Sequence, residues 1–181
     1  MTERQIIFSA PMVRAILSGS KSQTRRVVNP SHRAQIDLSR GDRLWVRETW
    51  QAIDGNELAL RIMTEPHPSR GWIEYAATVP EGHEPPPRWR PSIHMPRWAS
   101  RITLEVTGVR VERLQDISEA DALAEGIARH ADGNGFHIED GMHYSDDPRE
   151  SFASLWDSIN GHGSWDANPW VFVIEFKRIK P

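Results

Sequence analysis

The chain has 181 residues, a formal net charge of −3 and no cysteine. This length suits one domain with a real core, and two complete domains would be a tight fit. The charge excludes the global basic character that drives non-specific nucleic-acid binding, and the missing cysteines exclude disulfides and thiolate metal sites. No apolar run approaches the roughly 20 residues that span a bilayer. Because the first residues also lack the apolar core of a signal peptide, we expect a cytoplasmic protein with no membrane contact.

The N-terminal part of the chain predicts a strand, a helix, a loop and a second strand. Residues 6–8 are apolar and predict the first strand. A helix follows, because Pro11 suits a first helical turn, apolar residues recur after it at helical spacing, and Gly19 supplies a C-terminal stop. We therefore expect residues 19–26 to form the loop that leaves this helix. Residues 44–50 are rich in β-forming residue types and predict the next strand.

Residues 51 to about 97 predict an insertion with little regular structure. Residues 58–62 and 72–76 are short strand candidates, whereas Pro85–Pro87 indicates a partly extended excursion. Trp72 and Trp89 lie in this stretch and Trp98 follows it directly, so we interpret it as an elaboration on the core rather than as a linker.

The C-terminal part of the chain predicts two strands and two helices. Apolar residues alternate from Ile102 to Val111, as in a strand. Ser118 and Asp121 form a capping-box pattern for a helix that ends at Gly126. Residues 129–147 are rich in Gly, His and Asp and predict a loop.

A second helix begins at Asp147–Pro148 and ends at Gly161, because its apolar residues recur at i, i+3, i+4 and i+7. Residues 170–176 are a continuous apolar run, which predicts a central strand that is buried on both faces. The whole order, β-α-β-insertion-β-α-loop-α-β, is an α+β pattern whose separated strands suit a small, curved barrel.

Residues 19–26 read Gly-Ser-Lys-Ser-Gln-Thr-Arg-Arg and concentrate reactive groups in a short segment. A lysine close to a threonine, here Lys21 and Thr24, can act as a base beside a nucleophile. The following Arg25 and Arg26 can hold a phosphate or a carboxylate. The alternative is a solvated basic loop in which Thr24 caps a turn, since runs of charge are usually solvated.

Four segments in this order, residues 19–26, 41–50, 117–127 and 170–176, resemble the ASCH domain. That domain is similar to the PUA domain, a small pseudo-barrel often found on RNA-modifying proteins. The resemblance implies one α+β domain over residues 1–181, a small curved β-barrel with flanking helices. Residues 51–97 and 129–147 are not covered and would be insertions, as in the longer ASCH proteins of bacteriophages and prophages.

The resemblance also implies a catalytic site. Some small ASCH proteins are amidohydrolases that remove the acyl group of N4-acetylcytidine with a lysine, a threonine three residues later and a glutamate in a later helix. Those positions carry over to Lys21, Thr24 and Glu125. Lys21 can be a base only if burial or a nearby cation lowers its pKa. Glu125 would face the negative end of a helix dipole and so needs a cationic partner, unless it is an ordinary exposed glutamate.

A second group of residues is predicted to bind substrate. Adjacent strand residues point to opposite faces, so at most one of Arg47 and Glu48 can face a pocket, and a cross-strand ion pair is an equally good interpretation. By the same parity one of Trp45 and Trp50 lines the site while the other packs in the core. Trp98 is chosen because an arginine precedes it. The predicted substrate-binding residues are Arg25, Arg26, Arg47, Glu48, Trp45, Arg97 and Trp98.

Histidines and aspartates in the 129–147 segment raise the question of a metal site. The spacing of His130, His137 and His143 with Asp132 and Asp140 matches no ligand motif. A solvated loop explains them better, and the sequence predicts neither a metal nor a cofactor.

Three functions follow for the whole chain. The first is an amidohydrolase acting on N4-acylated cytosine, as in N4-acetylcytidine. The second is a non-catalytic PUA-like module that binds RNA or a modified nucleotide, because aromatic and arginine side chains can stack on unpaired bases. The third is a ribonuclease that uses the same polar cluster. The sequence leaves open whether the partner is a free nucleoside, an RNA or a modified DNA base.

Overall fold

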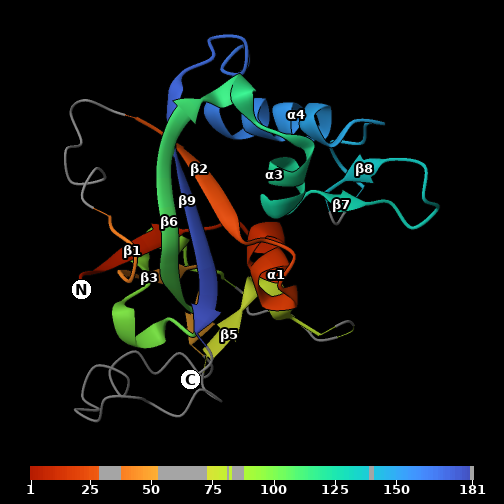
Figure 1. The fold of residues 1–181 in the computed structure, drawn as a ribbon. Helices are drawn as coiled ribbons and strands as arrows, with labels where there is room; N and C mark the ends of the chain where they lie inside the picture. Colours follow the sequence, from red (N-terminus) through yellow and green to blue (C-terminus); the bar gives the residue numbers. More distant parts are fainter. Residues whose placement is uncertain (29–37, 53–72, 81, 83–87, 139–140, 180–181) are drawn as a thin grey trace.

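The computed structural model describes residues 1–28, 38–52, 73–80, 82, 88–138 and 141–179. Its centre is a five-stranded sheet with the strand order β1-β3-β6-β9-β2 (Figure 1). β1 is parallel to β3, and the other neighbours are antiparallel. The strands are β1 (Glu3–Ile7), β2 (Gln23–Val27), β3 (Arg43–Arg47), β6 (Thr103–Arg113) and β9 (Trp170–Ile179).

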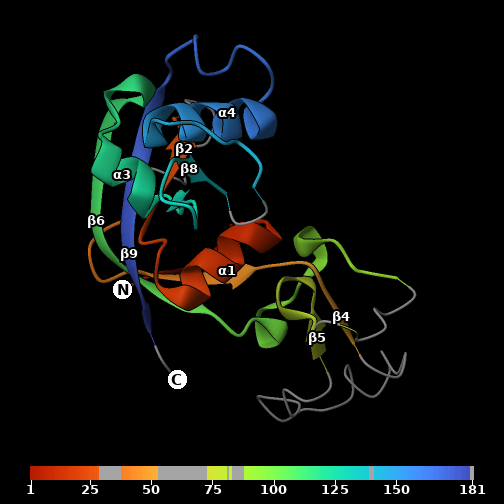
Figure 2. The same cartoon turned by 90° about the vertical axis from the view of Figure 1, so that its right-hand side faces the viewer.

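Three α-helices lie on the same side of the long strands β6 and β9, as Figures 1 and 2 show. They are α1 (Ala10–Ser18), α3 (Glu119–Ala124) and α4 (Pro148–Asn160). The main core lies between these helices and the sheet, where Val13 and Ile16 of α1 and Phe152 of α4 meet the buried residues of β6 and β9. The predicted α+β class is therefore confirmed.

The described strands form an open sheet and not a closed barrel, which corrects one part of the prediction. β1 and β2 are the two edges of the sheet. Where the described parts of these edges come together, Arg26 Nη2 on β2 donates a hydrogen bond to the Ile7 carbonyl oxygen on β1 at 2.9 Å. Curvature is nevertheless present, because β6 carries a bulge between Val106 and Gly108, and bulges bend a strand.

The segment 19–26 is only partly the loop that the sequence predicts. Its second half is strand β2, which pairs with β9 so that Thr24 lies opposite Ile174. The residue types of this segment carry little β-propensity, and the strand forms because β9 supplies the backbone partners. The loop that leaves α1 is therefore short and ends before Gln23.

The predicted helix boundaries are confirmed by their caps. Ser118 and Asp121 form the capping box at the start of α3, with both reciprocal hydrogen bonds present. Asp147 caps α4, and Gly161 follows its last residue. Strand β9 lies between β6 and β2, and its residues Val171–Ile174 are all buried, as predicted for a central strand.

The described part of the 51–97 insertion has a small core of its own. The predicted strand 44–50 divides into β3 and β4 (Trp50–Ala52), and β4 pairs with β5 (Ile73–Tyr75). This hairpin packs against Met95, Ala99 and Trp98. The predicted strand 58–62, Trp72 and Pro85–Pro87 lie outside the described residues. Short 3-10 turns span Ala76–Thr78, Ser92–His94, Arg97–Ala99 and, after β6, Leu114–Asp116.

The segment 129–147 is more ordered than a loop of turn residues implies. β7 (Ala128–Arg129) pairs with β8 (Phe136–His137) to form a hairpin. Ile138 then enters the main core, which ties the hairpin to the domain.

Gly126, which follows the Glu125 cap of α3, has a backbone φ of +103° and lies against α1 and the next loop. A Cβ atom there would lie 3.2 Å from Ala15 Cβ and 3.5 Å from Lys21 Cβ. We expect Gly126→Ala to lower the free energy of unfolding by about 1–3 kcal/mol, measured by urea denaturation. Gly19→Ala is the matched control, because Gly19 has a φ of +87° and a Cβ atom added there would meet nothing within 4 Å. An equal loss in both variants would contradict a packing role for Gly126.

Candidate functional site

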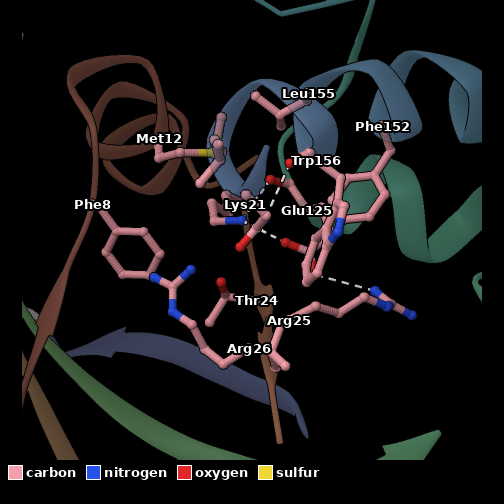
Figure 3. Close-up of a pocket in the computed structure, with 13 residues that line it drawn as sticks. Phe8, Met12, Lys21, Thr24, Arg25, Arg26, Glu125, Phe152, Leu155 and Trp156 are labelled. Carbon is pink, nitrogen blue, oxygen red and sulfur yellow. Dashed lines mark hydrogen bonds and ion pairs between the residues drawn. The ribbon is translucent and has the colours of Figure 1, made fainter. Parts of the chain in front are cut away.

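A pocket of about 340 Å³ opens between strand β2 and the helices α1, α3 and α4. Figure 3 shows Lys21, Thr24 and Glu125 in the middle, with Phe8 on one side and the aromatic residues of α4 on the other. This volume lies in the range of small-molecule sites. The lining residues are Phe8, Met12, Lys21, Thr24, Arg25, Arg26, Val27, Glu125, Phe152, Leu155, Trp156, Ile159 and Asn160.

Lys21 lies in the short loop between α1 and β2, and its side chain is buried. Its backbone N–H donates to the Ala15 carbonyl oxygen at 3.0 Å, which ties the loop to α1. Its Nζ donates to the Glu125 backbone oxygen at 2.6 Å and to Glu125 Oε2 at 2.9 Å. Burial lowers the pKa of Lys21, the nearby Glu125 carboxylate opposes this, and Arg26 and Arg25 lower the pKa further. A lysine can act as a base only if burial or a nearby cation lowers its pKa, and both causes act on Lys21 in this fold.

Thr24 is the second residue of β2, and only 2% of its surface is exposed. In Figure 3 its hydroxyl points toward the Lys21–Glu125 pair. Within the described part of the chain, no hydrogen bond to Thr24 Oγ1 is formed. Among the described residues, the hydroxyl therefore lines the pocket without a competing hydrogen-bond partner.

Glu125 is the C-cap of α3, where its charge faces the negative end of the helix. The carboxylate is buried and has two cationic partners, Lys21 through Oε2 and Arg25 Nη1 through Oε1 at 3.1 Å. Such pairing is what a buried carboxylate needs, because an unpaired buried charge costs several kcal/mol. The fold thus joins Lys21, Thr24 and Glu125, the three positions that the resemblance implied, in one pocket.

The two arginines after Thr24 have different surroundings. The Arg25 side chain is fully buried, and its Nη2 lies 2.5 Å from Glu112 Oε1, so its charge is engaged by protein carboxylates rather than directed at a ligand. Arg26 is half-buried and lies over the Phe8 ring at 5.3 Å from the centroid. Of the two, Arg26 is the better placed to contact a bound molecule.

The structure places the other predicted substrate-binding residues away from this pocket. Arg47 donates to the Ser92 oxygen at 3.0 Å and to the Ile93 oxygen. Arg97 pairs with Glu3 at 2.8 Å. Both guanidinium groups lie over the Trp45 ring, with the Cζ atom 5.6 Å from the ring centroid for Arg47 and 5.8 Å for Arg97. This cluster fastens the insertion to β1 and β3.

Glu48 and Trp98 are also structural in this arrangement. Glu48 is buried and accepts two hydrogen bonds of 2.9 Å from Arg101, so the expected ion pair forms with a residue just before β6. Trp98 packs edge-on against Trp50 at 5.7 Å in the second core. Trp45 lies in β3 and the buried Trp50 in β4, so the parity argument, which assumed one continuous strand, does not apply. Neither residue lines the pocket.

Several pocket residues were not singled out by the sequence. Phe152, Leu155, Trp156 and Ile159 were recognised as one apolar helix face, and that pattern is the signal that could have found them. A helical repeat shows which residues share a face, but it does not show where the face leaves the core and borders a pocket.

The histidine-rich segment forms contacts among its own residues. His130 pairs with Asp132 at 2.8 Å, and its ring lies 4.9 Å from that of His137. Among the described residues, no group of three potential metal ligands is present. Asp140 lies outside the described residues.

Comparison with known proteins gives a likeness of fold. No family model and no curated protein matches the chain. The hypothetical protein PH0355 aligns over 98% of this chain and all of its own, with 11% identity and a TM-score of 0.47. An ASCH domain from Lactobacillus crispatus JV V101 aligns over 98% of this chain and 79% of its own, with 12% identity and a TM-score of 0.42. The second bears the name of the family that the four sequence segments resemble. At these values neither likeness carries an argument about family or activity.

The described residues include no helix that is long and apolar enough to cross a membrane.

The buried ion cluster gives a direct stability prediction. Glu125→Gln leaves Lys21 and Arg25 without their shared carboxylate, and we expect a loss of about 3 kcal/mol in the free energy of unfolding, measured by urea denaturation. Glu119→Gln is the control, because Glu119 lies exposed on the same helix and should change stability by less than about 0.5 kcal/mol. Similar values for the two variants would show that the cluster contributes little.

Proposed function

We propose that the chain is an ASCH-type amidohydrolase that removes the acyl group from N4-acylated cytosine. The observation that carries this proposal is the meeting of Lys21, Thr24 and Glu125 in one pocket, with burial lowering the pKa of the lysine. A threonine hydroxyl needs an adjacent base to act as a nucleophile near neutral pH, and a desolvated lysine can be that base.

The hydrogen bonds of Lys21 suit the role of a base. A neutral lysine amine has two N–H groups and one lone pair. Within the described parts of the chain its Nζ has two acceptors, both on Glu125. Two N–H groups directed at them leave the lone pair to accept the Thr24 proton.

The proposed reaction has two halves. Thr24 Oγ1 attacks the amide carbonyl carbon while Lys21 takes the hydroxyl proton. The bond between the carbonyl carbon and N4 then breaks, and Lys21 passes its proton to N4. Cytidine leaves, and the acyl group remains on Thr24 as an ester. Water attacks this ester, Lys21 takes a proton from the water, and the carboxylic acid is released as the proton returns to Thr24.

Arg26 supports the charged intermediate in this scheme. Within the described residues its guanidinium makes one hydrogen bond, to Ile7, and lines the same pocket as Thr24. A guanidinium beside the attacked carbonyl stabilises the negative charge that develops on oxygen.

The opposite wall of the pocket is apolar and aromatic. Trp156 lines the pocket, and the stacking of a base on such a ring is worth about 1–3 kcal/mol. Met12, Leu155 and Ile159 add apolar surface that an acyl group can cover. A base with an attached acyl chain therefore matches both walls of the pocket.

Thr24→Val tests the nucleophile with little change in shape. We expect the variant to lose at least about 100-fold in kcat/KM for N4-acetylcytidine, followed by cytidine release, because covalent attack is abolished. Ser22→Ala is the control, since Ser22 is the exposed neighbour in the same segment and should retain activity. Equal activity of the Thr24 variant and wild type would end the amidohydrolase proposal. Binding of nucleosides without turnover by wild type would favour the non-catalytic module.

The rate should also depend on pH in a defined direction. The base is active when Lys21 is neutral, so kcat/KM should rise with pH and fall as Lys21 becomes protonated. Because burial lowers the pKa of Lys21, this midpoint should lie below about 10.4, the usual value for lysine. The profile is measured with N4-acetylcytidine, and the uncatalysed hydrolysis at each pH is subtracted. A rate that falls with increasing pH would contradict the role of Lys21 as the base.

A further inference from the structure

Arg25 lies at the centre of a chain of charges that leads from the pocket to the surface. Its Nη1 binds Glu125 at 3.1 Å, and its Nη2 lies 2.5 Å from Glu112 and 3.5 Å from Asp121. Its side chain has no exposed surface, and both Nη groups are directed at protein carboxylates rather than at a ligand.

Arg110 anchors the outer end of this chain of charges. It binds Glu112 Oε2 at 2.9 Å, Asp121 Oδ1 at 2.9 Å and Glu175 Oε1 at 2.5 Å. Although partial burial raises the pKa of Asp121, hydrogen bonds from Ser118 and Gln23 lower it to about 2. Asp121 therefore stays ionised at any pH at which the protein would work.

The proposed chemistry creates a specific electrostatic problem in this place. When Lys21 is neutral, the buried Glu125 carboxylate loses one of its two positive partners. An unpaired carboxylate in a buried site is costly and tends to take up a proton. Arg25 is the partner that remains, because an arginine keeps its charge throughout the accessible pH range.

We propose that Arg25 is a positioning residue that keeps the Glu125 carboxylate ionised and in place while Lys21 exchanges its proton, and that Glu112 sets the strength of this action. Glu112 does so because it competes with Glu125 for the same guanidinium. This inference rests on the proposed function for its catalytic meaning. It replaces the substrate-binding role that the sequence predicted for Arg25.

The charges that face Lys21 come from two elements. Glu125 faces it from the end of α3, and Arg25 and Arg26 face it from β2. The charged groups Glu112 and Arg110 of β6, Asp121 of α3 and Glu175 of β9 act through Arg25. α1 and α4 contribute uncharged lining residues, namely Met12, Phe152, Leu155, Trp156, Ile159 and Asn160.

Two substitutions should move the protonation of Lys21 in opposite directions. Arg25→Met removes a positive charge and leaves Glu125 to Lys21 alone, so Lys21 should hold its proton to higher pH. Glu112→Gln removes a negative charge and turns Arg25 more fully toward Glu125, so Lys21 should lose its proton at lower pH. General loosening of the fold would instead let water in and move the two variants the same way.

The chain suits a direct measurement, because it contains three lysines, Lys21, Lys177 and Lys180. Lysine labelled with ¹³C at Cε gives one NMR signal for each, and the shift of that signal reports protonation without any substrate. Lys177, which is 63% exposed and paired with Glu105, is an internal reference. Lys21→Gln assigns the Lys21 signal.

Arg110→Met is the matched control for charge. It removes a positive charge from the same network, but Arg110 is paired with Glu112, Asp121 and Glu175 and not with Glu125. We expect its effect on the Lys21 midpoint to be smaller than that of Arg25→Met. If Arg25→Met fails to fold, the direction of the Glu112→Gln shift decides the test.

The expected result is a higher Lys21 midpoint in Arg25→Met and a lower one in Glu112→Gln. The low-pH limb of kcat/KM should move in parallel, by about tenfold in rate for each pKa unit. An unchanged midpoint in both variants, or a shift of both in one direction, would overturn the inference. Opposite shifts without turnover of N4-acetylcytidine would support the electrostatic role of Arg25 and refute the proposed function alone.

Discussion

The buried contact between Lys21 and Glu125 is the constraint on which the rest of the site depends. It joins residues 104 positions apart and fixes the loop after α1 to the end of α3. Both groups lose most of their hydration, and only close pairing offsets that loss. The short helix α3 must therefore end at a defined place: its capping box fixes the start, and Gly126 follows the C-cap Glu125. The same burial that makes the contact expensive gives the lysine its lowered pKa.

The pocket owes its character to two walls of different origin. Strand β2, the loop before it and the end of α3 contribute the charged wall, where hydroxyl, amine and carboxylate meet. Helices α1 and α4 contribute the apolar wall, together with Phe8 at the end of β1. A desolvated lysine requires such surroundings, because open water would return its pKa to the usual value. The apolar wall thus serves the chemistry as well as the binding of a base.

The insertion after β3 uses charged and aromatic residues for attachment. Arg47, Arg97 and Trp45 stack together at the edge of β1 and β3, and Arg101 holds the buried Glu48. Arginine and tryptophan also bind nucleotides. Composition and sequence position therefore did not distinguish residues that attach the insertion from residues that bind a ligand. The distinction came from the partners: each arginine already has a protein acceptor within hydrogen-bonding distance.

Local signals in the sequence determined the elements whose causes are local. Pro11 and Gly19 delimited α1, Ser118 and Asp121 started α3, and the apolar run of β9 indicated a central strand, because each signal acts within a few residues. Residue types and spacing already indicated Lys21 and Thr24, whereas Glu125 was reached through the family resemblance. The meeting of all three in one pocket is a property of the fold.

Tertiary structure alone decided that residues 23–27 form a strand, because the ladder with β9 overrides a weak local propensity. It also decided the role of Arg25, whose partners Glu112 and Glu125 lie 87 and 100 residues along the chain. The sequence does not indicate which carboxylate will pair with a given arginine, since any carboxylate brought near it can balance its charge. Only the folded chain selects which one does.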